Sequence, residues 1–359
     1  MSAERIANLA QRVREFHGVE LEQVLEVIDY LRDGEDSVLV GGSLAYGLGN
    51  HKSDLDIVIA APPGGESSSR MPLEHFIDSL RVDVWKLRRD ELQEIFDRAR
   101  ESLQSEAAFA GAFGDVFEQA DLKLLHRVAY GVVIDGAPVA PSGEDYRAVA
   151  QDILIREYAE RMRHSLYVAQ LALANGAMVA ATINARFGVE EALQARIAAR
   201  GFPFSDNKWL RVRLDGEAPD LREVYTPLAI LPEGAEECRR FVEEAVAAAQ
   251  ELTGTPLEQG RLALDAAWEN AGLSLFGAGD LRLLVSPEQD VVFELGTEES
   301  EAWRALGEGT IWSCATCTPV QMSLCYSLYA QGMLKLAWSR GLPLAELDVP
   351  KEQAVDEVC

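Results

Sequence analysis

The sequence predicts an α+β fold, in which a sheet with flanking helices is followed by a helical part and a small α/β part. Three observations indicate this order. The first part alternates amphipathic helical patterns with short apolar runs typical of strands. From Asp145 to about Gly201 the pattern is helical and alanine-rich. Between residues 277 and 340, two short apolar runs flank a turn and precede helical stretches. The 359 residues are enough for about two or three domains.

In the first part, apolar residues at helical spacing predict an amphipathic helix over residues 20–32. The apolar runs Val38–Val40 and Ile57–Ile59 predict two strands, joined through the glycine-rich turn Gly41–Gly47. A further strand is expected at residues 81–87, where apolar side chains alternate with polar ones.

Helices are expected at residues 91–104 and 121–128, and a short strand at 130–136. The Ala140–Gly143 segment then predicts a domain boundary, because it contains proline, serine and glycine together. The predicted divisions are a first domain at 1–140, a helical domain at 141–255, a small C-terminal domain at 256–345 and an acidic tail at 346–359.

Three aspartates and the glycine-rich turn predict a site for metal ions and phosphates. Asp54 and Asp56 are two residues apart at the start of a strand, so both side chains are expected on one face beside Gly42 and Ser43. Asp83 supplies a third carboxylate from a later strand. Mg²⁺ prefers carboxylate oxygens and keeps positions for phosphates. Three carboxylates can bridge two metal ions about 3.5–4 Å apart, as in displacement at phosphorus.

The string Gly42-Ser43, the pair Asp54-Leu55-Asp56 and the later Asp83 resemble the signature of the DNA polymerase beta-like nucleotidyltransferases. The resemblance implies a mixed sheet with flanking helices, two Mg²⁺ ions and a nucleoside triphosphate substrate. It implies an enzyme that moves a nucleoside monophosphate, with AMP expected, to an acceptor hydroxyl and releases pyrophosphate. Gly42, Ser43 and Ser53 are then expected to bind the nucleotide, and Asp54, Asp56 and Asp83 to hold the metals and act in catalysis.

An asparagine on a predicted helix, Asn184, precedes the string Asn207-Lys208-Trp209-Leu210. This arrangement resembles the helical second domain of small-molecule nucleotidyltransferases, such as those that modify antibiotics. The resemblance implies that Lys208 reaches the triphosphate and that Asn184 frames the nucleotide pocket. The alternatives are a solvated surface lysine at 208 and an asparagine at 184 that serves helix packing.

In the last part, the apolar runs 281–285 and 291–295 predict a strand pair around the turn 286–290. Helices are expected at residues 298–306 and 319–338. This order resembles the small winged-helix domains that recognise peptides. The alternative is a helical cap that completes the substrate cleft.

The net charge of −26 bears on the acceptor. Nucleic-acid-binding proteins usually carry a basic stripe, and none is visible in this sequence. The charge therefore favours a small-molecule or peptide acceptor, although transfer to a tRNA or protein stays open. A non-catalytic nucleotide sensor or scaffold with this fold is the other alternative. The analogy with antibiotic-modifying relatives suggests a homodimer.

The cysteines and the apolar segments indicate the state of the thiols and the location of the protein. Cys314 and Cys317 form a lone C-x-x-C pair, far in sequence from all five histidines, which favours reduced thiols over a zinc site. The longest apolar stretch, residues 168–185, contains polar residues and predicts a buried helix rather than a membrane span. With no secretory signal pattern, a cytoplasmic location is expected.

Overall fold

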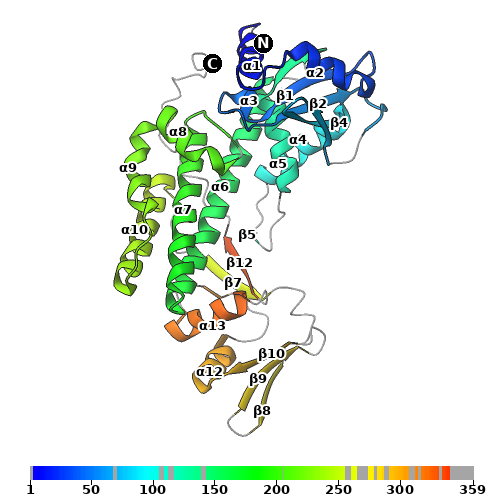
Figure 1. The fold of residues 1–359 in the computed structure, drawn as a ribbon. Coiled ribbons are helices and arrows are strands. Elements are labelled where there is room, and N and C mark those ends of the chain that lie inside the picture. Colours follow the sequence, from blue (N-terminus) through cyan, green and yellow to red (C-terminus); the bar gives the residue numbers. More distant parts are fainter. Residues whose placement is uncertain are drawn as a thin grey trace.

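In the computed structural model, a sheet region, a bundle of long helices and a group of short strands and helices follow one another along the molecule (Figure 1). The structure describes residues 3–67, 71–104, 109–111, 117–137, 139, 143–204, 206–254, 260–264, 274–278, 281–286, 291–306, 312–313, 317–330 and 334–339.

The sheet region is built on five strands in the order β3-β4-β2-β1-β6. Their bounds are Ser37–Gly41 (β1), Leu55–Ala61 (β2), Leu73–Ile77 (β3), Leu80–Arg88 (β4) and Val132–Asp135 (β6). Strands β2 and β4 run parallel, whereas the other neighbours are antiparallel. The sheet is therefore mixed, as predicted.

Two pairs of helices cover the two faces of this sheet (Figure 1). They are α1 (Ala3–His17) and α2 (Leu21–Ile28) on one face, and α4 (Arg89–Gln104) and α5 (Gln119–Tyr130) on the other. Along β2, Ile57 and Ile59 join the core under α1 and α2, while Val58 joins the core under α4 and α5. Because successive side chains alternate, Asp56 stands on the α4–α5 face.

The middle of the chain is helical, as predicted. Helices α6 (Gly143–Ala174) and α7 (Met178–Ala199) form a hairpin, and α10 (Ala235–Thr253) packs against α7. The first half of α6 contributes Tyr146 and Tyr158 to the core of the sheet region, and its second half belongs to the helical core. Helix α6 therefore belongs to both cores and connects the helical part to the sheet region.

The C-terminal part forms two small sheets, β10-β9-β8 and β11-β7-β12-β5, and the second one includes β5 from the first third of the chain. Their strands are Phe109–Gly111 (β5), Gly260–Leu264 (β7), Ser274–Ala278 (β8), Leu281–Ser286 (β9), Val291–Leu295 (β10), Trp312–Ser313 (β11) and Leu334–Ser339 (β12). The predicted strand pair is confirmed as the antiparallel hairpin of β9 and β10. Helix α12 (Thr297–Leu306) follows it, also as predicted.

The helix predicted over residues 319–338 is wrong in its last part. Helix α13 spans Pro319–Ala330, and residues 334–339 form the strand β12. Two features explain the difference. Leu334, Leu336 and Trp338 recur at every second position after Gly332, which suits a strand. This strand also pairs with both β7 and β5, which are distant in sequence, and such pairing overrides local propensity.

Several predictions fall outside these findings. The winged-helix interpretation stays a prediction, and the acidic tail at 346–359 and Cys314 lie outside the described residues. Cys317, the other member of the C-x-x-C pair, is half-buried, and burial raises the pKa of its thiol. None of the helices in the described ranges combines the length and the apolarity needed to span a membrane.

Candidate active site

A cavity of about 220 Å³ lies where the sheet region meets the helical part. It brings together Gly42, Ser43, Asp54, Asp56 and Asp83, which the sequence predicted as a site. The other described residues of its lining are Trp85, Lys123, His126, Arg127, Phe204, Asp206, Lys208 and Trp209.

The strand register explains why the carboxylates meet. Asp56 on β2 and Asp83 on β4 are direct partners in the parallel pairing, so they are neighbours on the same face. Both are buried, with 7% and 5% of their surface exposed, while Asp54 is half-buried. Burial raises the pKa of Asp56, and the charges of Asp54 and Asp83 raise it further, whereas Arg127 lowers it. The three carboxylates therefore form one electrostatic group.

The glycine at position 42 makes room for this group. Gly42 begins a short helix, α3 (Gly42–Tyr46), where the sequence predicted a turn, and has a φ of +69°. A Cβ atom at this position would lie 1.8 Å from the Oδ2 atom of Asp56. Both the backbone conformation and the space thus require glycine here.

Two residues predicted to bind the nucleotide are placed elsewhere. The hydroxyl of Ser53 accepts a hydrogen bond from the Asn50 backbone N–H at 3.0 Å, so it ties the turn before β2. The side chain of Asn184 donates to the carbonyl of Ala180 on its own helix at 2.8 Å. Neither is among the described residues that line the cavity. Their roles in nucleotide binding stay predictions.

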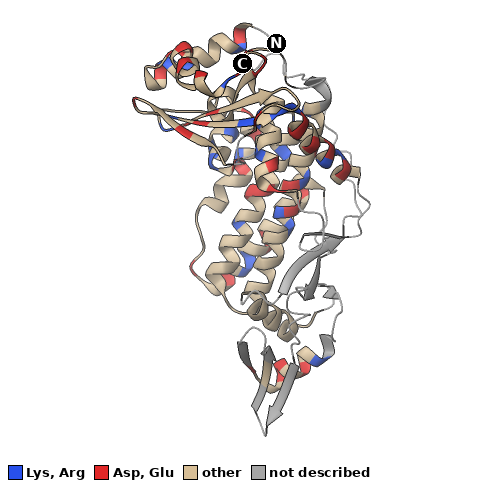
Figure 2. Ribbon diagram, turned by 90° about the vertical axis from the view of Figure 1, so that its right-hand side faces the viewer, with Lys and Arg blue, Asp and Glu red and all other residues tan. Residues whose placement is uncertain are grey.

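Helix α5 supplies three lining residues that the sequence analysis did not single out: Lys123, His126 and Arg127. The Nη2 atom of Arg127 donates to Oδ1 of Asp56 at 2.7 Å, and its guanidinium lies 4.3 Å from the ring centre of Trp85. The signal that could have found them is the helical spacing of Lys123 and Arg127 on one face. Figure 2 shows such cations interspersed with acidic residues along the described helices.

The opposite wall is the connection between α7 and α8 (Leu210–Gly216), of which residues 202–204 and 206–209 are described. Buried side chains from three helices donate to three successive carbonyl groups in it. Arg213 binds the carbonyl of Phe202, His126 that of Pro203 and Tyr158 that of Phe204. The connection is therefore fixed from the sheet side by α5 and from the helical side by α6 and α8.

Two ionisable groups that form hydrogen bonds to this wall have strongly displaced pKa values. Burial lowers the pKa of His126 to about 4, so the ring is neutral at pH 7 and its Nε2–H donates to Pro203 at 2.8 Å. The carboxylate of Glu191 on α7 accepts from the side chain of Asn207 at 2.6 Å. Burial raises the pKa of Glu191 to about 7. The wall is thus built from buried polar groups.

Lys208, which the sequence predicted at the triphosphate, lines the cavity beside Trp209. Its Nζ atom lies 3.1 Å from Oδ2 of Asp206, and 61% of its side chain is exposed. Asp206 also accepts from the Lys208 backbone N–H at 3.0 Å. The lysine is therefore presented at the mouth of the cavity rather than buried in it.

The donor chemistry of the site suits a hard divalent cation. Asp54, Asp56 and Asp83 offer only carboxylate oxygens, and the missing Cβ of Gly42 leaves Oδ2 of Asp56 accessible. In the described part of the chain, however, no three acidic, histidine or cysteine side chains are already gathered as metal ligands. The residues fit Mg²⁺ in kind, but Oδ1 of Asp56 and both oxygens of Asp83 accept hydrogen bonds from arginines.

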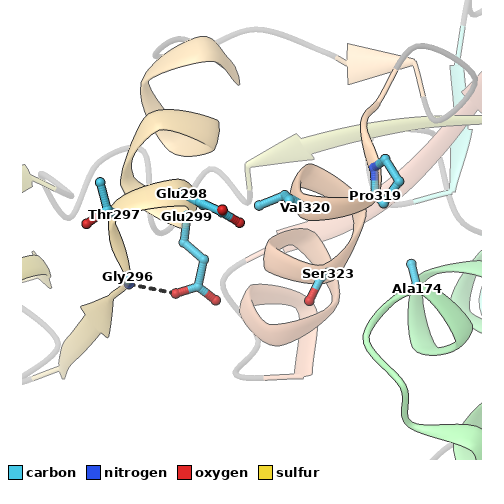
Figure 3. A pocket seen from close by; sticks show the side chains of 8 residues that line it. All are labelled: Ala174, Gly296, Thr297, Glu298, Glu299, Pro319, Val320 and Ser323. Atoms are coloured by element: carbon cyan, nitrogen blue, oxygen red, sulfur yellow. Dashed lines mark hydrogen bonds between the residues drawn. The ribbon is translucent and has the colours of Figure 1, made fainter.

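A larger cavity, of about 530 Å³, lies far from these carboxylates in the C-terminal part (Figure 3). It opens between the starts of α12 and α13 and the end of α6, where Glu299 accepts from the Gly296 backbone N–H at 2.8 Å. Its described lining includes Glu298 and Glu299 but no Lys, Arg or His. The described residues of this lining therefore offer no cationic side chain to a phosphate group.

Comparison with known proteins gives one family match, and its range includes the three aspartates of the smaller cavity. Residues 21–109 match the family model of the nucleotidyltransferase domain, and this range contains all three aspartates. No curated protein matches the chain. A solved nucleotidyltransferase-like protein from Exiguobacterium sibiricum matches with 13% identity and a TM-score of 0.34, covering 65% of this chain and 78% of its own. A similarity that low carries no weight here. Residues 21–109 thus match a nucleotidyltransferase domain, and this match supports nucleotidyl transfer as the general activity.

Proposed function

We propose that the enzyme transfers a nucleoside monophosphate, with AMP expected, from a nucleoside triphosphate to a hydroxyl group of a small-molecule or peptide acceptor. One observation carries the proposal: Asp54, Asp56 and Asp83 line a single cavity together with Gly42, Ser43 and three cationic side chains. A metal–triphosphate complex requires both kinds of group, because carboxylates bind the metal ion and cationic side chains bind the phosphates.

The roles follow from the positions. Asp54, Asp56 and Asp83 would hold the divalent cations that accompany the nucleotide. The Gly42 backbone and the Ser43 hydroxyl bind the phosphates, and Lys208 approaches them from the opposite wall. Bound Mg²⁺ supplies charge neutralisation and lowers the pKa of the acceptor hydroxyl.

The proposed reaction is a single displacement at the α-phosphorus. The acceptor oxygen forms a bond to the α-phosphorus, the bond from that phosphorus to the bridging oxygen breaks, and pyrophosphate leaves. The hydroxyl proton passes to a carboxylate, for which Asp83 is the candidate because it faces the same cavity. Positioning and charge neutralisation supply most of the acceleration, as in phosphoryl transfer generally.

The acceptor class rests on charge. The chain carries a net charge of −26, and the described lining of the cavity contains four carboxylates against three Lys and Arg side chains. A polyanionic acceptor such as a nucleic acid is disfavoured by such a field. A neutral or cationic hydroxyl compound, or a peptide, is favoured.

The test uses ATP labelled at either the α- or the γ-phosphorus, with Mg²⁺ and a panel of hydroxyl compounds and peptides, and reads products by mass spectrometry. The proposal predicts that α-label enters the acceptor and γ-label leaves as pyrophosphate. Transfer of γ-label would show a kinase instead. Nucleotide binding without any transfer across the panel and a cell metabolite extract would favour the alternative of a nucleotide sensor.

A further inference from the structure

The two buried carboxylates of the site are each engaged by an arginine. Asp56 accepts from Arg127 at 2.7 Å, and Asp83 accepts two hydrogen bonds from Arg81, at 2.7 and 3.0 Å. A metal ion that binds these carboxylates therefore competes with the two guanidinium groups for their oxygens.

The two arginines differ in how they are held. Arg81 lies on β4, is 43% exposed, also pairs with Glu74 and is not among the described residues that line the cavity. Arg127 is only 18% exposed, and its guanidinium lies over the ring of Trp85 inside the cavity. The Asp56–Arg127 pair is therefore the one whose exchange matters.

The backbone fixes Arg127 at this place. Helix α5 approaches β1 so closely that a Cβ on Gly41 would lie 2.7 Å from the Cβ of Arg127. The base of the arginine side chain is thus held against the sheet, while its guanidinium remains at the cavity lining. If Asp56 were taken by another partner, the attraction between the guanidinium and the Trp85 ring, 4.3 Å from its centre, would favour keeping Arg127 in the cavity.

We propose that Arg127 is an exchangeable counter-ion: it neutralises Asp56 until a divalent cation takes that carboxylate, and then turns to the phosphates that arrive with the cation. The inference rests on the proposed function, because the cation and the phosphates are those of the nucleotide complex. A guanidinium suits both partners, since its planar donors match carboxylate and phosphate oxygens alike.

This exchange couples the two ligands. A cation that binds alone displaces Arg127 from Asp56 and leaves the guanidinium without an anion, so its affinity is lowered. When the nucleotide is present, the phosphates accept the released guanidinium and offset that cost. Metal and nucleotide therefore bind with positive coupling, and by linkage each raises the affinity of the other by the same factor.

The test measures the binding of Mn²⁺ by electron paramagnetic resonance, in the full chain, with and without a non-hydrolysable ATP analogue. In R127Q, Mn²⁺ alone is expected to bind at least about fivefold more tightly than in the wild type. The enhancement of Mn²⁺ binding by the nucleotide is expected to fall by a similar factor. The matched control is R98Q, because Arg98 pairs with the buried Asp121 outside the cavity lining.

Unchanged or weaker binding of Mn²⁺ alone in R127Q, with R98Q equal to the wild type, overturns the inference. If R127Q does not fold, R127K decides: it keeps the charge, so Mn²⁺ alone binds as in the wild type, but the nucleotide enhancement falls because lysine lacks the planar donors. Full enhancement in R127K contradicts the inference. Because metal binding is read without turnover, absence of nucleotidyl transfer would reject the proposed function alone.

Discussion

The two walls of the active-site cavity are built in different ways. On the sheet side, Asp56 and Asp83 are placed by the pairing of β2 with β4. On the helical side, the residues at 202–204 and 206–209 have little regular structure apart from one turn, η2 (Asn207–Trp209), and are held by buried side chains that bind their carbonyl groups. One wall thus depends on backbone register and the other on individual side chains. Substitutions in the two walls are therefore expected to have different effects on activity and stability.

The largest effect is expected from removing a charge on the sheet wall. Asp56→Asn, and likewise Asp54→Asn, should reduce nucleotidyl transfer at least about 100-fold with little loss of stability. The amide has the size of the carboxylate, and its oxygen can still accept a hydrogen bond from Arg127. Asp121→Asn is the control, because Asp121 is also buried and bound by an arginine but lies outside the lining. Near-normal turnover in the Asp56 variant would remove the sheet wall from the chemistry.

Two glycine substitutions distinguish the effect of the space beside Asp56 from the effect of backbone strain. Gly42→Ala forces the Asp56 carboxylate to move and strains a backbone with φ +69°, so transfer should fall about tenfold or more while stability drops by about 1–3 kcal/mol. Gly64→Ala carries a similar strain at φ +81°, with nothing within 4 Å of its Cβ, and should leave transfer unchanged. Equal turnover in both variants would mean that the gap beside Asp56 is not needed.

The helical wall is tested by a matched pair of tyrosines. Tyr158→Phe leaves the carbonyl of Phe204 without its donor, which costs about 1–3 kcal/mol of unfolding free energy. Because this carbonyl belongs to the wall, KM for the nucleotide should rise several-fold while kcat changes less. Tyr146→Phe removes an equivalent buried bond to Leu92, away from the cavity, and should change stability without changing KM. A rise in KM in both variants would contradict a specific role for the wall.

The smallest effect concerns pH. The pKa of His126 is lowered from 6.5 to about 4, so the unfolded chain binds more protons between these values and the fold loses stability as pH falls from 6.5. The pKa of Glu191 is raised from 4.5 to about 7, so its contribution is present below pH 4.5 and is lost as pH rises to 7.

Chemical denaturation across pH 4 to 8 should therefore show opposite changes in two variants. His126→Gln should reduce the loss of unfolding free energy as pH falls below 6.5. Glu191→Gln should reduce the loss of unfolding free energy as pH rises towards 7. Each change is expected to reach up to about 3 kcal/mol. Glutamine keeps a donor at position 126 and an acceptor at 191, so the Pro203 and Asn207 contacts can persist. Parallel pH curves for the two variants and the wild type would show that neither group titrates as inferred.

The sheet wall could be predicted from the sequence because its information is local. The apolar alternation around Asp83 and the two-residue spacing of Asp54 and Asp56 specify a face, and the glycine at 42 marks a close approach. The helical wall could not be predicted in this way. Arg213, His126 and Tyr158 bind carbonyl groups, and every residue has one, so no sequence pattern shows which carbonyl is bound.

The same reasoning explains the other differences. No local sequence pattern links Arg127 to its partner, Asp56, which is 71 residues away in the chain. Strand β12 was assigned to a helix because its partners, β5 and β7, are also distant in sequence. Where a feature depends on contacts between remote segments, local propensity is a weak guide.

The central claim is that the carboxylates of residues 54, 56 and 83 jointly bind the cations of a nucleotide complex. The most direct measurement is anomalous diffraction from crystals grown with Mn²⁺ and a non-hydrolysable nucleoside triphosphate. The account predicts manganese bound by oxygens of all three side chains, with the α-phosphorus facing the open side of the cavity. Manganese bound elsewhere, or Asp83 still held by Arg81 and free of metal, would contradict it.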